Sequence, residues 1–129
     1  MRATFTHLSL NVTDLGFYKD LLAHLGIRVV AEYKYGFGMT DSTVGVWVFK
    51  AQPQYQKGPF HRKAIGVNHI AFRTKSRGDV DALYRDYLLP RKIPVLYGGP
   101  ADHPEYEPGY YAVYFEDPDR IKIEVMYLP

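Results

Sequence analysis

The sequence of 129 residues has no cysteine, one tryptophan and almost no excess of charge, with 16 Lys and Arg against 14 Asp and Glu. Without cysteine, disulfides, thiol nucleophiles and thiolate metal sites are excluded, so any metal must be bound through nitrogen and oxygen. The only basic cluster, His61-Arg62-Lys63, is short. The sequence therefore argues against nucleic acid as a partner.

Long hydrophobic runs are also missing. No apolar stretch approaches the roughly 20 residues that span a bilayer. The start, Met1-Arg2-Ala3-Thr4, leads straight into a strand-like run and does not look like a secretory signal. We therefore expect a cytoplasmic protein without a membrane partner. The length suits a single domain, and 47% apolar with 23% charged residues is typical of globular proteins.

Aromatic residues are abundant: the chain has 12 tyrosines and seven phenylalanines. Aromatic side chains in this number suit either the lining of a pocket or a subunit interface. The sequence leaves both uses open.

An internal repeat organises the chain. The run His7 to Val12 reads like the run His69 to Thr74, and a helical pattern follows each. The first helix is expected to end at Gly26, and the second to begin at Ser76 as N-cap and to end before Pro90. Three strand-like stretches follow each helix. The pattern predicts an α+β fold of two βαβββ modules, at about 1–52 and 64–129, joined by a linker at about 53–63.

The stretches after the helices predict strands at 29–33, around Phe37, and at 44–50, 93–97, 110–115 and 121–127. The residues Glu116-Asp117-Pro118-Asp119-Arg120 predict a tight hairpin. Residues 98–109, rich in glycine and proline, predict a loop that could act as a lid.

Two histidines and one carboxylate indicate a candidate site. His7, His69 and Glu124 lie on three separate predicted strands, and they form the donor set of an open divalent-metal site. Strand alternation places Glu124 opposite Ile123 and Val125, facing away from the core. A single histidine on a strand is usually structural, so the equivalent positions of His7 and His69 in the repeat carry the hypothesis.

These motifs resemble the vicinal oxygen chelate superfamily, which includes glyoxalase I, extradiol dioxygenases, fosfomycin-resistance thiol transferases and bleomycin-resistance proteins. The resemblance rests on the segments at 7–12, 17–18, 25–26, 67–72, 111–119 and 123–124. It implies a cupped, eight-stranded mixed sheet with helices outside, a homodimer, and a divalent metal held by His7, His69 and Glu124. The ion could be Fe, Mn, Zn, Ni or Mg.

The sequence departs from the family pattern at two positions. Glyoxalase I generally uses a further glutamate on the last strand of the first module, where alignment of the two modules places Trp47 opposite Glu124. No carboxylate lies between Val44 and Lys50. The resemblance therefore favours a three-ligand dioxygenase, lyase or transferase acting on a small molecule with vicinal oxygens over a true glyoxalase I. Arg120 stands where the family usually has glycine, so either Arg120 adopts a positive φ with some strain or the turn differs.

Further residues are candidates for binding substrate: Trp47, Arg73, Tyr111 and Tyr114. His103, on the predicted loop, is a candidate acid or base. Two other interpretations stay open. A metal-free aromatic cup could bind an aromatic or cationic, antibiotic-type compound, or the site could survive only as structure.

Overall fold

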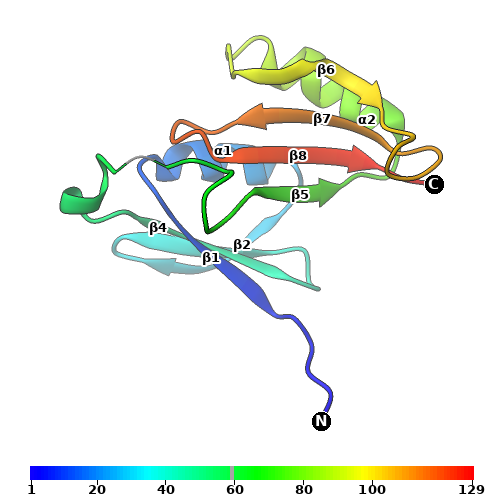
Figure 1. Cartoon of the computed structure of the whole chain (residues 1–129). Helices are drawn as coiled ribbons and strands as arrows, with labels where there is room; N and C mark the ends of the chain where they lie inside the picture. Colours follow the sequence, from blue (N-terminus) through cyan, green and yellow to red (C-terminus); the bar gives the residue numbers. More distant parts are fainter. Residues whose placement is uncertain (59) are drawn as a thin grey trace. The chain divides into compact units, whose positions relative to one another are not determined.

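The computed structural model describes residues 1–58 and 60–129 and divides into two compact units, Met1–Pro59 and Phe60–Pro129. The division falls inside the predicted linker. Each unit contains a strand, a helix and three further strands, and its four strands form one mixed sheet (Figure 1). The predicted pair of βαβββ modules is confirmed.

The first unit contains β1 (His7–Val12), α1 (Leu15–His24), β2 (Arg28–Tyr33), β3 (Gly36–Thr40), β4 (Gly45–Lys50) and a short 3₁₀ helix, η1 (Pro53–Tyr55). The strand order is β1-β4-β3-β2, with only β1 and β4 parallel. Asp14 caps α1, since its Oδ1 accepts a 3.0 Å hydrogen bond from the amide of Phe17. The helix ends before Gly26, which has a φ of 76°.

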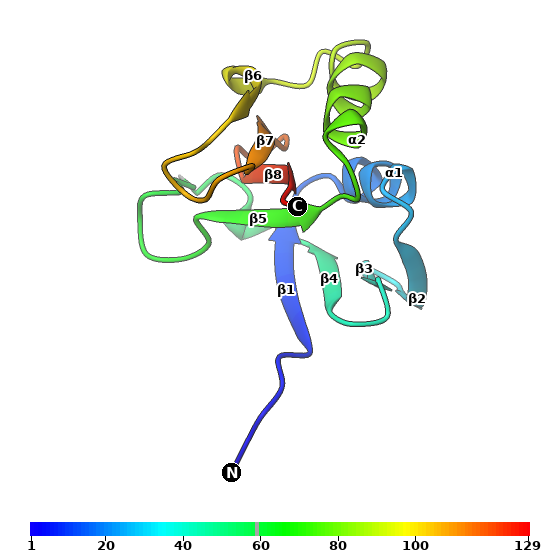
Figure 2. The same cartoon turned by 90° about the vertical axis from the view of Figure 1, so that its right-hand side faces the viewer.

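The second unit contains β5 (His69–Arg73), α2 (Arg77–Ala82), η2 (Leu83–Leu88), β6 (Val95–Asp102), β7 (Tyr111–Glu116) and β8 (Lys122–Tyr127). Its strand order is β5-β8-β7-β6, with only β5 and β8 parallel. Ser76 Oγ accepts a 3.1 Å hydrogen bond from the amide of Asp79, so the predicted N-cap is confirmed. The helix continues through η2, a π-helical segment, and α2 lies beside the sheet (Figure 2).

The two faces of the second sheet differ in what they bury. One face packs under the helical segment, whose buried residues are Val80, Leu83, Tyr87 and Leu88. The sheet contributes Val113, Phe115, Ile123 and Val125 to this core. By strand alternation the other face carries Ala112, Tyr114 and Met126, which form a separate small cluster. Glu124 belongs to this second face, as the sequence predicted.

The prediction of a strand at 93–97 followed by a loop from residue 98 is wrong. Strand β6 runs to Asp102, and its pairing with β7 is interrupted between Leu96 and Ala101. Tyr97, Gly98 and Gly99 have φ values of 57°, 82° and 108°. This bulge absorbs the two glycines, which is why pairing resumes beyond them. A left-handed conformation costs a non-glycine residue such as Tyr97 about 1–2 kcal/mol.

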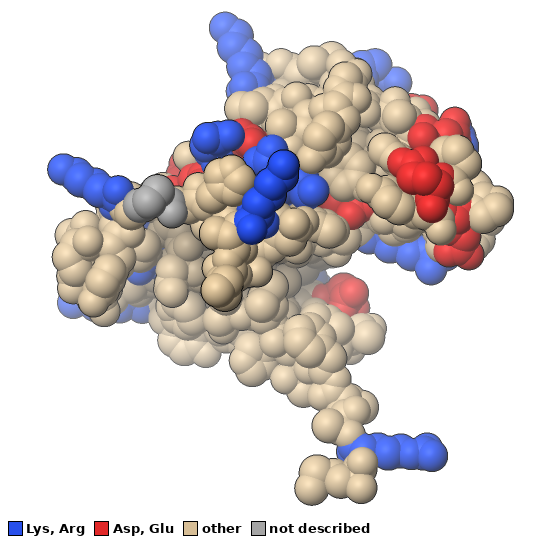
Figure 3. All heavy atoms as spheres, viewed as in Figure 1, with Lys and Arg blue, Asp and Glu red and all other residues tan. Residues whose placement is uncertain are grey.

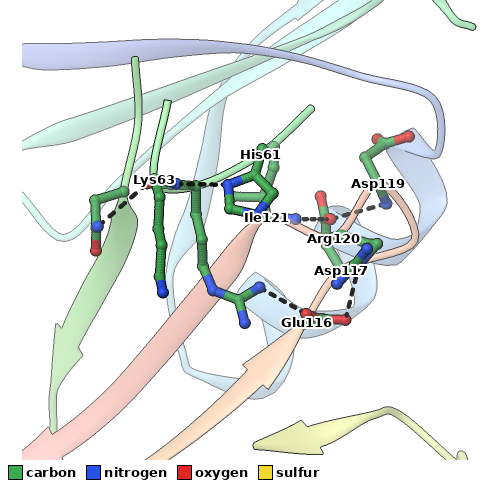
Figure 4. A network of polar contacts seen from close by, with 9 residues as sticks. His61, Lys63, Glu116, Asp117, Asp119, Arg120 and Ile121 are labelled. Carbon is green, nitrogen blue, oxygen red and sulfur yellow. Dashed lines mark hydrogen bonds and ion pairs between the residues drawn. The ribbon is translucent and has the colours of Figure 1, made fainter. Parts of the chain in front are cut away.

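The predicted hairpin between β7 and β8 is confirmed, and Asp117 organises it (Figure 4). Asp117 Oδ1 accepts hydrogen bonds from the amides of Asp119 and Ile121, at 2.8 and 2.7 Å. Arg120 has a positive φ, 67°, which is the first of the two alternatives. Beside the turn, Glu116 accepts a 2.7 Å hydrogen bond from Arg62, which ties the start of the second unit to its hairpin.

In the first unit, Trp47 lies against the glycines of its own sheet. A Cβ atom added to Gly38 or Gly45 would clash with the indole ring. The indole also donates a 3.3 Å hydrogen bond from Nε1 to the Tyr33 hydroxyl. The two glycines therefore create the space that Trp47 fills.

We expect Gly45→Ala to displace the Trp47 ring and to lower the free energy of unfolding by about 1–3 kcal/mol, because the added methyl overfills the site. Trp47 is the only tryptophan, so the displacement can be read as a shift in fluorescence emission. Gly78→Ala is the control: its Cβ would meet only Ser76 Oγ, at 3.6 Å, and should leave the emission unchanged. An unshifted spectrum in Gly45→Ala would contradict this packing.

Candidate functional site

Glu124 is the centre of the polar cluster in the second unit. Its side chain is 3% exposed. Oε1 accepts hydrogen bonds from the hydroxyls of Tyr110 and Tyr114, at 2.5 and 2.9 Å, and Oε2 lies 3.1 Å from Nε2 of His69. Burying an unpaired carboxylate is costly, and the two hydroxyl donors offset part of that cost.

The sheet register brings these residues together. Glu124 lies opposite Tyr114 on β7 and Ala71 on β5, and His69 lies opposite Lys122. Because strand residues two apart share a face, Glu124, Tyr114 and His69 point to the same side, and Tyr110 follows the same alternation just before β7. Tyr110 was missed by sequence reasoning, because only the register identifies its partner.

Asn68 fixes the orientation of the His69 ring. The Asn68 amide nitrogen donates a 3.2 Å hydrogen bond to the carbonyl of Arg62, which leaves Oδ1 to face His69 Nδ1 at 2.7 Å. Nδ1 therefore carries a proton, and in the neutral ring Nε2 presents a lone pair. A histidine whose second nitrogen is held in this way is typical of metal ligands.

A neutral His69 would direct this lone pair at the Glu124 carboxylate. Two acceptors 3.1 Å apart need a cation between them, either a proton or a metal ion. Bonds from a metal to imidazole nitrogen and carboxylate oxygen are about 2.0–2.2 Å long, so the two atoms are close enough to be neighbouring ligands of one ion. The residues present thus fit a metal.

The two tyrosines remain hydrogen-bond donors. Burial, followed by the hydrogen bond to Glu124, raises the pKa of both Tyr110 and Tyr114 well above the ordinary value. Both hydroxyls are therefore protonated at neutral pH and hold Oε1 of the carboxylate.

His7 occupies the equivalent place in the first unit. It pairs with Gly45 as His69 pairs with Lys122, and Ser9 pairs with Trp47 as Ala71 pairs with Glu124. The alignment of Trp47 with Glu124 is confirmed. His7 Nδ1 lies 3.0 Å from the Thr6 hydroxyl, and its ring centroid is 5.0 Å from that of Trp47. In the described part of the chain, no three His, Asp or Glu side chains gather as a metal site.

Two predicted substrate residues are held elsewhere. The Tyr111 hydroxyl donates a 2.6 Å hydrogen bond to Asp81, and the Arg77 guanidinium lies 4.0 Å from the centre of the Tyr111 ring. Tyr111 therefore lies on the face of the sheet that packs against the helix, whereas Tyr114 lies on the other face. Arg73 donates a 2.6 Å hydrogen bond to the Leu128 carbonyl. Neither residue is a hydrogen-bond partner of Glu124, and a role of either in binding substrate stays a prediction.

Tyr114 and His103 help to line a hollow of about 240 Å³ on the second unit, with Tyr97, Glu105, Tyr106 and Lys122. Sequence reasoning missed these last four residues. Alternation from Glu124 could have identified Lys122, whereas Tyr97 is brought to the hollow by the bulge in β6.

In the part of the chain that the structure describes, no helix is long and apolar enough to cross a membrane.

Comparison with known proteins agrees with this architecture. Residues 4–125 match the model of the Glyoxalase/Bleomycin resistance protein/Dioxygenase superfamily. The uncharacterized protein YqjT of Bacillus subtilis (strain 168) is 31% identical over 93% of this chain and 95% of its own length. A solved glyoxalase-like protein from Bacillus halodurans has 33% identity and a TM-score of 0.83, over 96% and 95% of the two chains. The fosfomycin resistance protein FosX of Listeria monocytogenes shares the fold, with 16% identity and a TM-score of 0.72 over 100% and 96% of the two chains.

We expect Tyr114→Phe to lower the free energy of unfolding by about 1–3 kcal/mol, because it removes a buried hydrogen bond to the Glu124 carboxylate. Tyr111→Phe is the matched control. It also removes a hydroxyl bonded to a carboxylate, but an exposed one, and should cost less than about 1 kcal/mol. Urea denaturation of both variants measures the difference. Equal losses would show that the burial of Glu124 has no energetic weight.

Proposed function

The chain belongs to the Glyoxalase/Bleomycin resistance protein/Dioxygenase superfamily, and on that premise we propose that it is a divalent-metal-dependent enzyme acting on a small molecule with vicinal oxygens. His69 and Glu124 would hold the ion in a two-histidine, one-glutamate set. His7 is proposed as the third ligand because it holds the position in the first unit that His69 holds in the second.

The 3.1 Å approach of His69 Nε2 to Glu124 Oε2 carries the proposal. Three neighbours prepare this pair. Asn68 keeps Nε2 of His69 free to bind, while Tyr110 and Tyr114 engage only Oε1 and leave Oε2 available. Such outer partners commonly determine metal affinity.

A bound ion would supply Lewis acidity to the adjacent oxygens of a substrate or, if redox-active, chemistry with dioxygen. Three protein ligands leave coordination positions open for a bidentate substrate. Iron, manganese, zinc, nickel and magnesium all remain candidates.

The side chain at position 47 limits which reactions of the superfamily we propose for this protein. A glutamate at this position would supply the proton transfer of glyoxalase I, but Trp47 stands there with glycines beneath it. We therefore favour a dioxygenase, lyase or transferase. His103 remains a candidate acid or base, since it lines the hollow that Tyr114 also lines.

The second candidate is a metal-free binding protein for an antibiotic-type small molecule. The aromatic hollow beside Tyr114 favours it, because stacking needs no metal. Ligand binding that survives chelator treatment, in a protein that takes up no metal, would identify this function.

We also propose that the protein is a cytoplasmic homodimer. The edge strand β2 and the turn after it expose Val29, Val30, Tyr33 and Tyr35, and exposed aromatic and branched residues suit a subunit interface. Light scattering coupled to gel filtration measures the mass in solution.

We expect protein purified without chelator to contain a nearly stoichiometric divalent metal by elemental analysis, and His69→Ala to lose it. His24→Gln is the control, because His24 lies at the end of α1 in the first unit. Adding the correct ion to stripped protein at 100 times its dissociation constant should stabilise the fold by about 2.7 kcal/mol. Repeated absence of metal, with no ion raising the melting temperature, would reject the enzyme and favour the binding protein.

A further inference from the structure

We infer that the hollow on the second unit binds a planar aromatic compound with one anionic group, and that Lys122 is the counter-charge for that group. The inference deepens the proposed function and rests on it for the reaction, because it names the substrate class. The binding itself involves residues of the second unit only and needs no metal.

Aromatic rings form the walls of the hollow. The Tyr97 ring meets Tyr114 edge to face at 5.4 Å between centroids, and His103 meets Tyr114 in the same way at 5.5 Å. His103 also stacks on Tyr106, with 5.5 Å between centroids and 19° between planes. Rings set at such angles offer both faces and edges to a flat guest, which is the geometry that aromatic pairs prefer.

The volume of the hollow is large enough for one aromatic ring. Its volume is about 240 Å³, and a cavity of roughly 150 Å³ is enough to hold benzene in a protein interior. The hollow therefore has room for one aromatic ring with a small substituent.

The ammonium group of Lys122 favours a negatively charged substituent on the ligand. Its ammonium lies 5.7 Å from the centre of the Tyr97 ring and 5.5 Å from that of Tyr114, and no carboxylate of the described residues pairs with it. Glu116, its neighbour in the register, is engaged by Arg62. An anion would add an ion pair to contacts that are now only cation–π, whereas a cationic guest would be repelled.

Acidic side chains gather near the C-terminal end of the second unit (Figure 3), and Glu105 lies among the lining residues. These charges weigh less than Lys122. Glu105 is 59% exposed and faces His103 Nδ1 at 2.9 Å, while Asp102 is paired with Arg77. Water and salt screen an exposed charge more effectively than a half-buried one.

The backbone conformation of Tyr97 is a further argument that the hollow binds a ligand. Tyr97 keeps a φ of 57° in the β6 bulge, a conformation that is unfavourable for a bulky residue. In this conformation its ring contacts both Tyr114 and the Lys122 ammonium. Bulges often redirect a side chain in this way beside a binding site.

The test is titration of chelator-treated protein with benzoate, neutral benzamide and benzylammonium, followed by amide chemical shifts in NMR spectra. We expect benzoate to bind about fivefold more tightly than benzamide, a difference typical of one partly exposed ion pair. Benzylammonium should bind most weakly. Lys122→Gln should reduce benzoate affinity to that of benzamide, and Tyr106→Leu should weaken both ligands.

Lys75→Gln is the matched control, because Lys75 is an exposed lysine of the same unit and should leave every affinity unchanged. Equal affinities for benzoate and benzamide, tightest binding of benzylammonium, or an unchanged benzoate preference in Lys122→Gln would overturn the inference. Binding that persists in His69→Ala supports it and separates it from the metal site. Failure of metal uptake would leave this result intact, and failure of benzoate binding would leave the metal result intact.

Discussion

The buried carboxylate of Glu124 is the constraint on which the second unit depends. A charge in this position is stable only with directed partners, and here the hydroxyls of Tyr110 and Tyr114 donate to it while His69 lies 3.1 Å away. The register between β7 and β8 has to keep Tyr114 opposite Glu124. The hairpin that sets this register depends in turn on Asp117, which binds two amides of the turn.

The two units use one strand pattern for different purposes. At equivalent register positions, the second unit has Glu124 and the first has Trp47. The Glu124 carboxylate needs hydroxyl donors. The Trp47 indole instead needs room to pack, and Gly38 and Gly45 provide it because they have no side chain. The two units therefore share a backbone pattern but differ in chemistry, and the candidate ligands His69 and Glu124 meet in the polar one.

Much of this fold could be predicted from periodicity and caps. The repeat, both helices and the hairpin followed from local patterns. The full length of strand β6 could not be predicted, because two successive glycines are typical of a loop. In the structure the pairing of β6 with β7 resumes after these glycines. The site could be predicted only in part. The partner of Tyr110 is Glu124 on the neighbouring strand, and the partner of Tyr111 is Asp81 on α2. Both contacts depend on tertiary packing and strand register, which a single sequence does not specify.

The left-handed backbone conformation of Tyr97 is strained, but it places the Tyr97 ring in the wall of the hollow. Glycine would adopt the same φ without a steric penalty, so replacement of this tyrosine would relax the chain while deleting a wall of the hollow. The strain at Tyr97 and the ring contacts that it makes possible thus belong together, and glycine at this position would remove both.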